Sequence, residues 1–282
     1  MYKLKQISTA VALTLAASTS AHAIIITTDT SAANLAAAVT SAGGGGLTVV
    51  GSSTLSGQSN ATGTSSGTFT NASGTYSIGN GIVLSSGDVA DYGDGPNTQS
   101  GQTTGYGTTA TAAQQALLFP IDGKPTHFDV TQLDVNFTTS TGSVFFNVVF
   151  GSDEFPEFQG SSFIDAFGLY LNGVNIAFFE GQPINIDHPS IAAISGTELD
   201  GVLLNNGFPL QFSAGGLDTT LTHTLTFIVA DSGDSSLDST VYIGSLAGVA
   251  PPPPNGVPEP ASLALLGIGL AGLGLMRHRK MA

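Results

Sequence analysis

Three short segments of this chain are crowded with carboxylate side chains, which can hold a hard metal ion or move protons. The first segment follows an apolar run and contains Asp153, Glu154 and Glu157, with Asp165 a few positions further on. Two carboxylates about 5 Å apart repel by nearly 1 kcal/mol in water and by about 3 kcal/mol at an effective dielectric constant near 20. The sequence therefore predicts that these groups are solvated, protonated or neutralised by a cation.

A second acidic segment carries Asp231, Asp234 and Asp238, and a third runs over residues 88–97. Gly and Ser between the acids favour tight turns that bring oxygen ligands together, which suits Ca²⁺, although the EF-hand spacing is absent. Two interpretations stay open: a Ca²⁺ site, or turns in which Asp bonds its own backbone. The candidate ligands are Asp153, Glu154, Glu157, Asp165, Asp231, Asp234 and Asp238.

The case for catalysis is weaker. Residues 24–250 contain three histidines, and His223 falls on the apolar face of a predicted strand, where a hydrogen-bonded core histidine is expected. Two carboxylates of the Asp153–Glu157 segment could hydrolyse a glycan, but among 19 acids some pair will lie at a suitable separation by chance. Trp, common on sugar-stacking surfaces, is absent. We predict a non-catalytic protein and keep a glycan-active hydrolase as the alternative.

The charge balance of residues 24–250 is strongly negative. Only one of the six Lys and Arg residues, Lys124, lies there, together with 19 of the 20 acids, so the formal charge is 1 − 19 = −18. This argues strongly against binding to nucleic acid and against docking to anionic lipid, both of which require basic side chains. Cations, neutral glycans and basic partners remain. The chain has no Cys, so disulfides and thiolate metal sites are also excluded.

The elements around the acidic segments are mostly strands. Asp29-Thr30-Ser31 is expected to cap one short N-terminal helix over residues 32–40, and Asn172-Gly173 marks a β-hairpin. Alternating or continuous apolar patterns predict strands over residues 132–138, 144–150, 167–171, 174–179, 221–229 and 241–246. The run 144–150 is apolar on both faces and is expected to be central. These elements predict an all-β fold, an antiparallel β-sandwich of jelly-roll type.

Both ends of the chain look like targeting segments. A basic start, an apolar run over residues 7–17 and Ala21-His22-Ala23 predict a signal peptide over residues 1–23 and export by the Sec route. The domain then covers residues 24–250, and residues 251–256 form a Pro-rich linker.

The last segment, residues 257–282, combines a helix-breaking motif, an apolar run and a basic end. We expect a single, short membrane helix whose basic end stays in the cytoplasm. The segment resembles the PEP-CTERM sorting signal. The resemblance implies a transient inner-membrane anchor that an exosortase recognises and processes, before display at the cell surface or release into the extracellular matrix. Its signal residues are Val257, Pro258, Glu259, Pro260, Arg277, Arg279 and Lys280.

Four separated motifs, at residues 81–89, 150–158, 163–173 and 228–239, resemble the choice-of-anchor L domain. Phe155 replaces the usual Tyr of that pattern and Ile164 replaces a polar residue, but every carboxylate is present. The resemblance implies an extracellular β-rich domain of a surface or matrix protein, with no established catalytic residues. The function expected from both resemblances is adhesion or association with exopolysaccharide in a biofilm, with Ca²⁺ stabilising the acidic loops.

Overall fold

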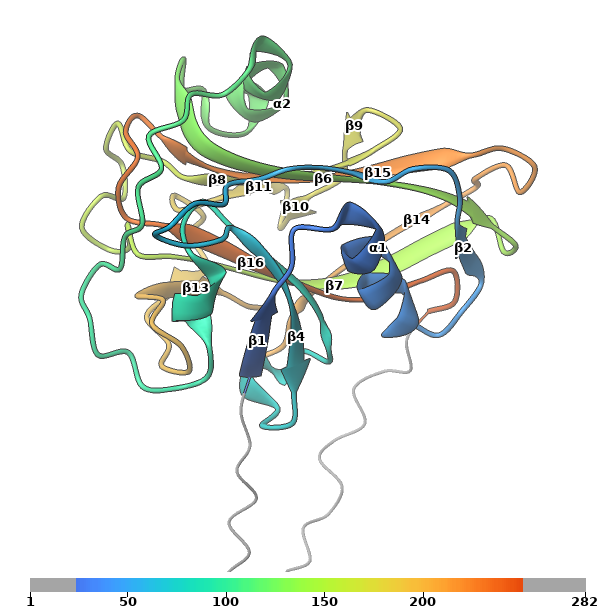
Figure 1. Ribbon diagram of the computed structural model, residues 1–282, viewed down its shortest axis with the longest axis horizontal. Coiled ribbons are helices and arrows are strands. Elements are labelled where there is room, and N and C mark those ends of the chain that lie inside the picture. Colours follow the sequence, from blue (N-terminus) through green and yellow to red (C-terminus); the bar gives the residue numbers. More distant parts are fainter. Residues whose placement is uncertain (1–23, 251–282) are drawn as a thin grey trace, which may run out of the picture.

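The computed structural model describes residues 24–250 as two antiparallel β-sheets packed face to face (Figure 1). This confirms the all-β prediction, while the jelly-roll description stays a prediction. The signal peptide, the Pro-rich linker and the sorting segment with its expected helix lie outside the described residues. Within residues 24–250 no helix is both long enough and apolar enough to span a membrane.

The first sheet has the strand order β1-β4-β5-β16-β7-β13-β12, and β14 also pairs with β7. The apolar run 144–150 lies in β7, which has β16 on one side and β13 and β14 on the other, so its predicted central position is confirmed. The strands are β1 (Ile24–Thr28), β4 (Ser66–Asn71), β5 (Gly81–Ser85), β7 (Ser143–Ser152), β12 (Ile191–Ala192), β13 (Gly201–Leu203), β14 (Leu210–Gly215) and β16 (Ser239–Ala247).

The second sheet has the order β10-β11-β8-β15-β6-β2, with β3 paired to β6 and β9 paired to β8. The strands are β2 (Leu47–Val49), β3 (Thr54–Ser56), β6 (His127–Thr139), β8 (Ala166–Leu171), β9 (Val174–Asn175), β10 (Phe178–Phe179), β11 (Gln182–Asn185) and β15 (His223–Ser232).

The predicted hairpin is present but its second strand is shorter than expected. Asn172 and Gly173 have φ of 52° and 82°, as a type I′ turn requires. The second strand stops at Asn175, whose side chain accepts a hydrogen bond from the Ala177 amide at 2.9 Å, and β10 then pairs with β11. The long strand also begins later than expected, because Leu221 is 56% exposed and precedes β15.

The N-terminal helix is confirmed as α1 (Ala32–Ser41), with Ser31 accepting from the Asn34 amide at its start. Leu35 and Val39 are fully buried and pack with residues of both sheets. The core between the sheets is rich in phenylalanine, including Phe137, Phe146, Phe167 and Phe227.

The expectation of a single helix is wrong, because a second helix, α2 (Ala112–Asp122), lies on the outer face of the second sheet (Figure 1). Thr111 and Gln114 form a capping box at its start, and Leu118 and Ile121 pack onto the sheet. Pro120 near its end weakens the helical pattern of the sequence. Two short 3₁₀ helices, η1 (Thr75–Ser77) and η2 (Val89–Tyr92), border the outer face of the first sheet.

The paired strands β7 and β16 run from one end of the sandwich to the opposite end. At one end Ser152 of β7 pairs with Ser239 of β16. At the other end β16 finishes at Ala247, and the Gly248 amide donates to the Gly45 carbonyl at 2.7 Å. The acidic segments gather at the first of these ends.

Candidate functional site

Antiparallel pairing brings acids from distant parts of the chain together, because the end of each strand lies beside the start of its neighbours. Asp153 follows β7, Asp238 precedes β16 and Asp200 precedes β13. Ser152 of β7 pairs with Ser239 and with Gly201, which sets the three aspartates side by side. The Asp153 amide donates to the Asp238 carbonyl at 3.0 Å.

A buried tyrosine links two of these carboxylates. The Tyr92 hydroxyl donates to Oδ2 of Asp153 at 2.8 Å and lies 3.4 Å from Oδ2 of Asp238. The Asp200 amide donates to the other oxygen of Asp153 at 3.2 Å, and the Thr104 amide donates to Asp238 at 2.9 Å. Loop residues therefore hold both carboxylates in fixed positions.

Asp165 connects the two sheets. It immediately precedes β8, and the neighbouring Ala166 pairs with Ala230 of β15, so Asp165 lies beside the end of β15 that carries Asp231. Its Oδ1 accepts from the Ser232 amide at 3.0 Å, and its Oδ2 accepts from the Ser239 hydroxyl at 2.9 Å. The first of these donors belongs to the second sheet and the other to the first sheet.

Five carboxylates thus form what we call the acidic cluster. Each is at most 2% exposed, so solvation by bulk water is excluded for all of them. Three of its oxygens have no hydrogen-bond partner: both oxygens of Asp231 and Oε2 of Glu154. The members of the acidic cluster are Asp153, Glu154, Asp165, Asp231 and Asp238.

Burial and repulsion from neighbouring carboxylates raise the pKa of every carboxyl in the acidic cluster. Burial is the main cause of the rise in the pKa of Asp153 to about 8 and of Glu154 to about 8, and it raises the pKa of Asp238 to about 7. Burial, and then the charge of Glu154, raise the pKa of Asp165 well above its usual range. For Asp231, burial and the charges of Asp165 and Asp238 do the same.

One neighbouring hydroxyl acts in the opposite direction on Asp231. The Ser86 side chain lowers the pKa of Asp231, but it does not meet the geometry of a hydrogen bond to either carboxylate oxygen. We therefore regard the Asp231 carboxylate as unpartnered, because a bond outside normal geometry stabilises a buried charge only weakly.

The remaining two predicted ligands lie outside the acidic cluster. Glu157 is exposed, and Asp234, which is partly exposed, accepts from the Ser236 amide at 3.1 Å as a turn-forming aspartate does. In residues 24–250 no set of three or more Asp, Glu or His side chains is arranged to hold a metal ion. The calcium site stays a prediction.

The third acidic segment supplies caps and loop contacts instead. Asp88 caps η2 by accepting from the Ala90 amide at 3.1 Å, and Asp91 accepts from the Gln102 side chain at 2.8 Å. Asp94 accepts from the Thr75 hydroxyl at 2.8 Å.

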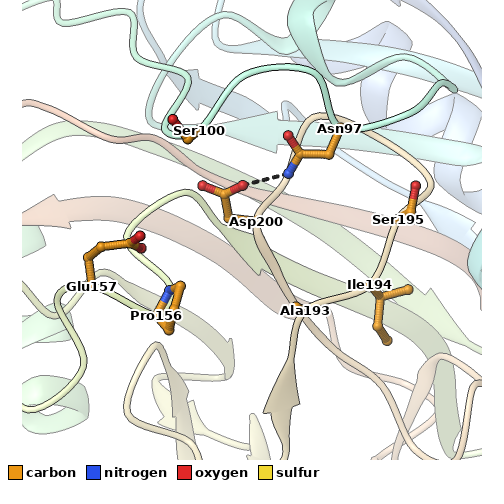
Figure 2. Close-up of a pocket in the computed structure, with 8 residues that line it drawn as sticks. All are labelled: Asn97, Ser100, Pro156, Glu157, Ala193, Ile194, Ser195 and Asp200. Atoms are coloured by element: carbon orange, nitrogen blue, oxygen red, sulfur yellow. Dashed lines mark hydrogen bonds between the residues drawn. The ribbon is translucent and has the colours of Figure 1, made fainter.

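A surface hollow of about 360 Å³ adjoins the acidic cluster (Figure 2). Glu157 and Pro156 stand on one side of it, Asn97 and Ser195 on the other, and the Asn97 amide donates to Asp200 at 2.5 Å. A smaller hollow of about 150 Å³ shares Ser100, Glu157 and Asp200 with it and reaches Asp153. No basic side chain lines either hollow.

The histidines have structural partners. His223 is buried in β15. Its Nδ1 lies 3.0 Å from the side-chain amide nitrogen of Asn172, and its Nε2 lies 2.9 Å from the Asp218 carbonyl. These contacts confirm the expected hydrogen-bonded core histidine. His127 is fully buried between Asp122, at 2.7 Å, and Gln115, at 2.9 Å. His188 is 3.0 Å from the Phe179 carbonyl.

Sequence reasoning missed Tyr92, Asp200 and Asp129. Tyr92 lies inside the third acidic segment, so its proximity to Asp88 and Asp91 was the only signal available. Asp129 accepts from three consecutive amides, those of residues 106–108, at 2.8, 3.1 and 2.6 Å, and so fixes the loop that reaches Asp238. Its position inside the long strand β6 hides this role in the sequence.

Two family models match this chain. The choice-of-anchor L domain matches residues 24–202, and the PEP-CTERM protein-sorting motif matches residues 256–280. The first match ends before β15, so the resembling motif at 228–239 lies outside it. No curated protein and no solved structure matches the chain. The sorting motif implies an exported surface protein that an exosortase recognises and sorts, with a membrane-anchored intermediate before surface display. The chain belongs to the choice-of-anchor L family and carries a PEP-CTERM sorting motif.

Proposed function

We propose that this protein is a non-catalytic surface or matrix domain that associates with extracellular polysaccharide. On this proposal the Sec route exports it through residues 1–23, and the C-terminal segment holds it in the inner membrane until processing. Family membership and the sorting motif support its extracellular location. Adhesion within a biofilm is the role that fits such a domain.

We infer the class of ligand from the residues that line the surface hollow. Asn97, Ser100 and Ser195 offer amide and hydroxyl groups, while Glu157 and Asp200 offer carboxylates. Such groups hydrogen-bond sugar hydroxyls, and carboxylates also attract amines. A formal charge of −18 over residues 24–250 repels polyanions, so we propose neutral or amine-bearing polysaccharides.

Substitution of Ser195 by Trp tests this proposal, because the indole would fill the hollow. We expect Ser195→Trp to reduce co-sedimentation with a neutral or amine-bearing polysaccharide at least tenfold. Thr219→Trp is the matched control, since Thr219 is exposed next to the strand ends remote from the acidic cluster. Equal binding by wild type and Ser195→Trp would show that this hollow does not bind the polysaccharide.

The hydrolase alternative draws no support from the family matches, neither of which is an enzyme family. Glu154 is buried and lines neither hollow, whereas Asp153 and Glu157 both line the smaller one. Turnover on a panel of polysaccharides that disappears in Asp153→Asn with Glu157→Gln would favour the hydrolase over the binding domain.

Calcium is the remaining part of the proposed function. The acidic end of the sandwich contains loops from three parts of the chain, and a divalent cation there would hold them together. Oxygen ligands of this kind suit Ca²⁺, and extracellular sites with a Kd of about 10⁻⁴ to 10⁻³ M suit its concentration outside cells.

A further inference from the structure

Two members of the acidic cluster have buried oxygens with no partner. Asp231 is 1% exposed and neither of its carboxylate oxygens accepts a hydrogen bond. Glu154 is 2% exposed and its Oε2 is also unpartnered. A buried polar atom without a partner costs about 1–3 kcal/mol, and more when it carries a charge. Three such oxygens in one cluster therefore indicate a missing electropositive partner.

The protein supplies no positive side chain to this position. Lys124 is the single Lys or Arg in residues 24–250, and its Nζ donates to the Ser161 carbonyl at 2.9 Å. Among the described residues the one ion pair is His127 with Asp122, at 2.7 Å, and neither belongs to the acidic cluster. The partner must come from the medium.

Asp165 interacts electrostatically with both residues that carry unpartnered oxygens. The charge of Glu154 acts on Asp165, and the charge of Asp165 acts on Asp231 more strongly than any other charge does. Both oxygens of Asp165 already accept hydrogen bonds from Ser232 and Ser239, which fixes the carboxylate and leaves it further lone pairs. Gly233 and Ser236 of the β15–β16 loop, which follows Asp231 along the chain, are exposed.

We propose that one Ca²⁺ ion binds beside the fixed Asp165 carboxylate, with Asp231 and the Oε2 atom of Glu154 as its carboxylate ligands. Two acidic side chains are enough, because Ca²⁺ completes its shell with carbonyl oxygens, hydroxyls and water. Such a shell is consistent with the absence of a ready-made set of three acidic or imidazole side chains in residues 24–250. The site has only hard oxygen donors, which disfavours zinc and copper.

This inference deepens the calcium part of the proposed function, and it excludes the exposed Glu157 and the partly exposed Asp234 from the ligand set. It predicts one ion that joins the end of β7 to the end of β15, and thereby joins the first sheet to the second. Polysaccharide binding at the surface hollow is measured separately, so either proposal can fail while the other stands.

The test uses the full chain in a mild non-ionic detergent, with Ca²⁺ alone as the probe. Titration calorimetry gives stoichiometry and Kd, and far-ultraviolet circular dichroism gives the melting temperature, since the chain has no Trp. We expect one Ca²⁺ per chain and, at about 100 times the Kd, a melting temperature about 5–10 °C above that in EDTA.

Three variants locate the ion. Asp231→Asn and Glu154→Gln keep the shape of each side chain and remove its charge, so each should weaken Ca²⁺ binding at least tenfold and abolish most of the shift. Glu157 is in the same loop as Glu154 but is exposed, so Glu157→Gln should keep both the Ca²⁺ affinity and the shift in melting temperature. If Asp231→Asn does not fold in EDTA, Glu154→Gln carries the test alone.

Several results would overturn the proposal. They are the absence of a Ca²⁺-dependent shift and of binding heat in the wild type, full binding by both Asp231→Asn and Glu154→Gln, or loss of binding in Glu157→Gln. An equal shift with Mg²⁺ at the same concentration would overturn the choice of Ca²⁺, because Mg²⁺ demands a tighter octahedral shell.

Discussion

In the absence of divalent ions, Asp153 should make the folded domain less stable as the pH rises from about 4 to 8. Burial is the largest cause that raises the pKa of Asp153 from 3.8 to about 8, and the charges of Asp200 and Asp238 raise it further. The folded state therefore holds a proton that the unfolded chain releases near pH 4. The contribution of Asp153 to stability is therefore greatest below pH 4, and it is lost as the pH rises until the folded carboxyl also ionises near pH 8.

The size of this loss follows from the same two pKa values. Each tenfold difference in proton affinity corresponds to about 1.4 kcal/mol, so the whole interval corresponds to about 6 kcal/mol as an upper bound. Asp153→Asn removes the titration while keeping an oxygen acceptor for Tyr92. The free energy of unfolding of Asp153→Asn relative to wild type should therefore rise by several kcal/mol between pH 4 and pH 8.

Urea unfolding of residues 24–250, which contain both sheets, measures this difference by circular dichroism in EDTA at a series of pH values. Glu157→Gln is the control, because its exposed side chain should leave the pH profile of the wild type unchanged. Parallel profiles for the wild type and Asp153→Asn would refute the reasoning, since they would show that Asp153 does not keep its proton in the folded state.

Two further predictions concern packing. A Cβ atom on Gly87 would lie 1.6 Å from Oδ2 of Asp238, so Gly87→Ala should displace that carboxylate and lower the free energy of unfolding by about 1–3 kcal/mol in urea titrations. An unchanged urea midpoint would show that the loop accommodates the added methyl group without loss of stability. Phe146 is 1% exposed and contacts the rings of Phe212 and Phe227, so Phe146→Ala should cost about 3–5 kcal/mol by the same measurement. A loss below about 1 kcal/mol would contradict its place in the core.

Local patterns in the sequence predicted most of the individual elements. The alternation around Leu133 and Val135 and the apolar run in β7 mark strands, because pleated strands place successive side chains on opposite faces. Ser31 and Asn172-Gly173 mark a helix start and a hairpin turn through their own hydrogen bonding and φ. The helix α2 was missed because Pro120 and only two deeply buried apolar positions, Leu118 and Ile121, leave its pattern weak.

The candidate site could be predicted only in part. The acids adjoining strand ends were visible in the sequence, but which ends meet depends on the pairing of β7 with β16 and β13, and these pairings join segments about 50 to 100 residues apart. Two residues of the same type also differ in burial: Glu154 is 2% exposed, whereas Glu157, three positions later, is exposed. No periodicity in a loop distinguishes these two positions.

The direction of β16 has a consequence for how the domain is presented. This nine-residue strand begins beside the acidic cluster and ends eight positions later, roughly 26 Å away at about 3.3 Å per residue. Ala250, the last described residue, lines a cavity with Phe145 and Gln211 at that remote end. A tether joined to the carboxyl end of this domain therefore pulls from the pole opposite the clustered aspartates. The carboxylate-rich pole would then face outward, toward whatever sugars and ions lie beyond the cell envelope.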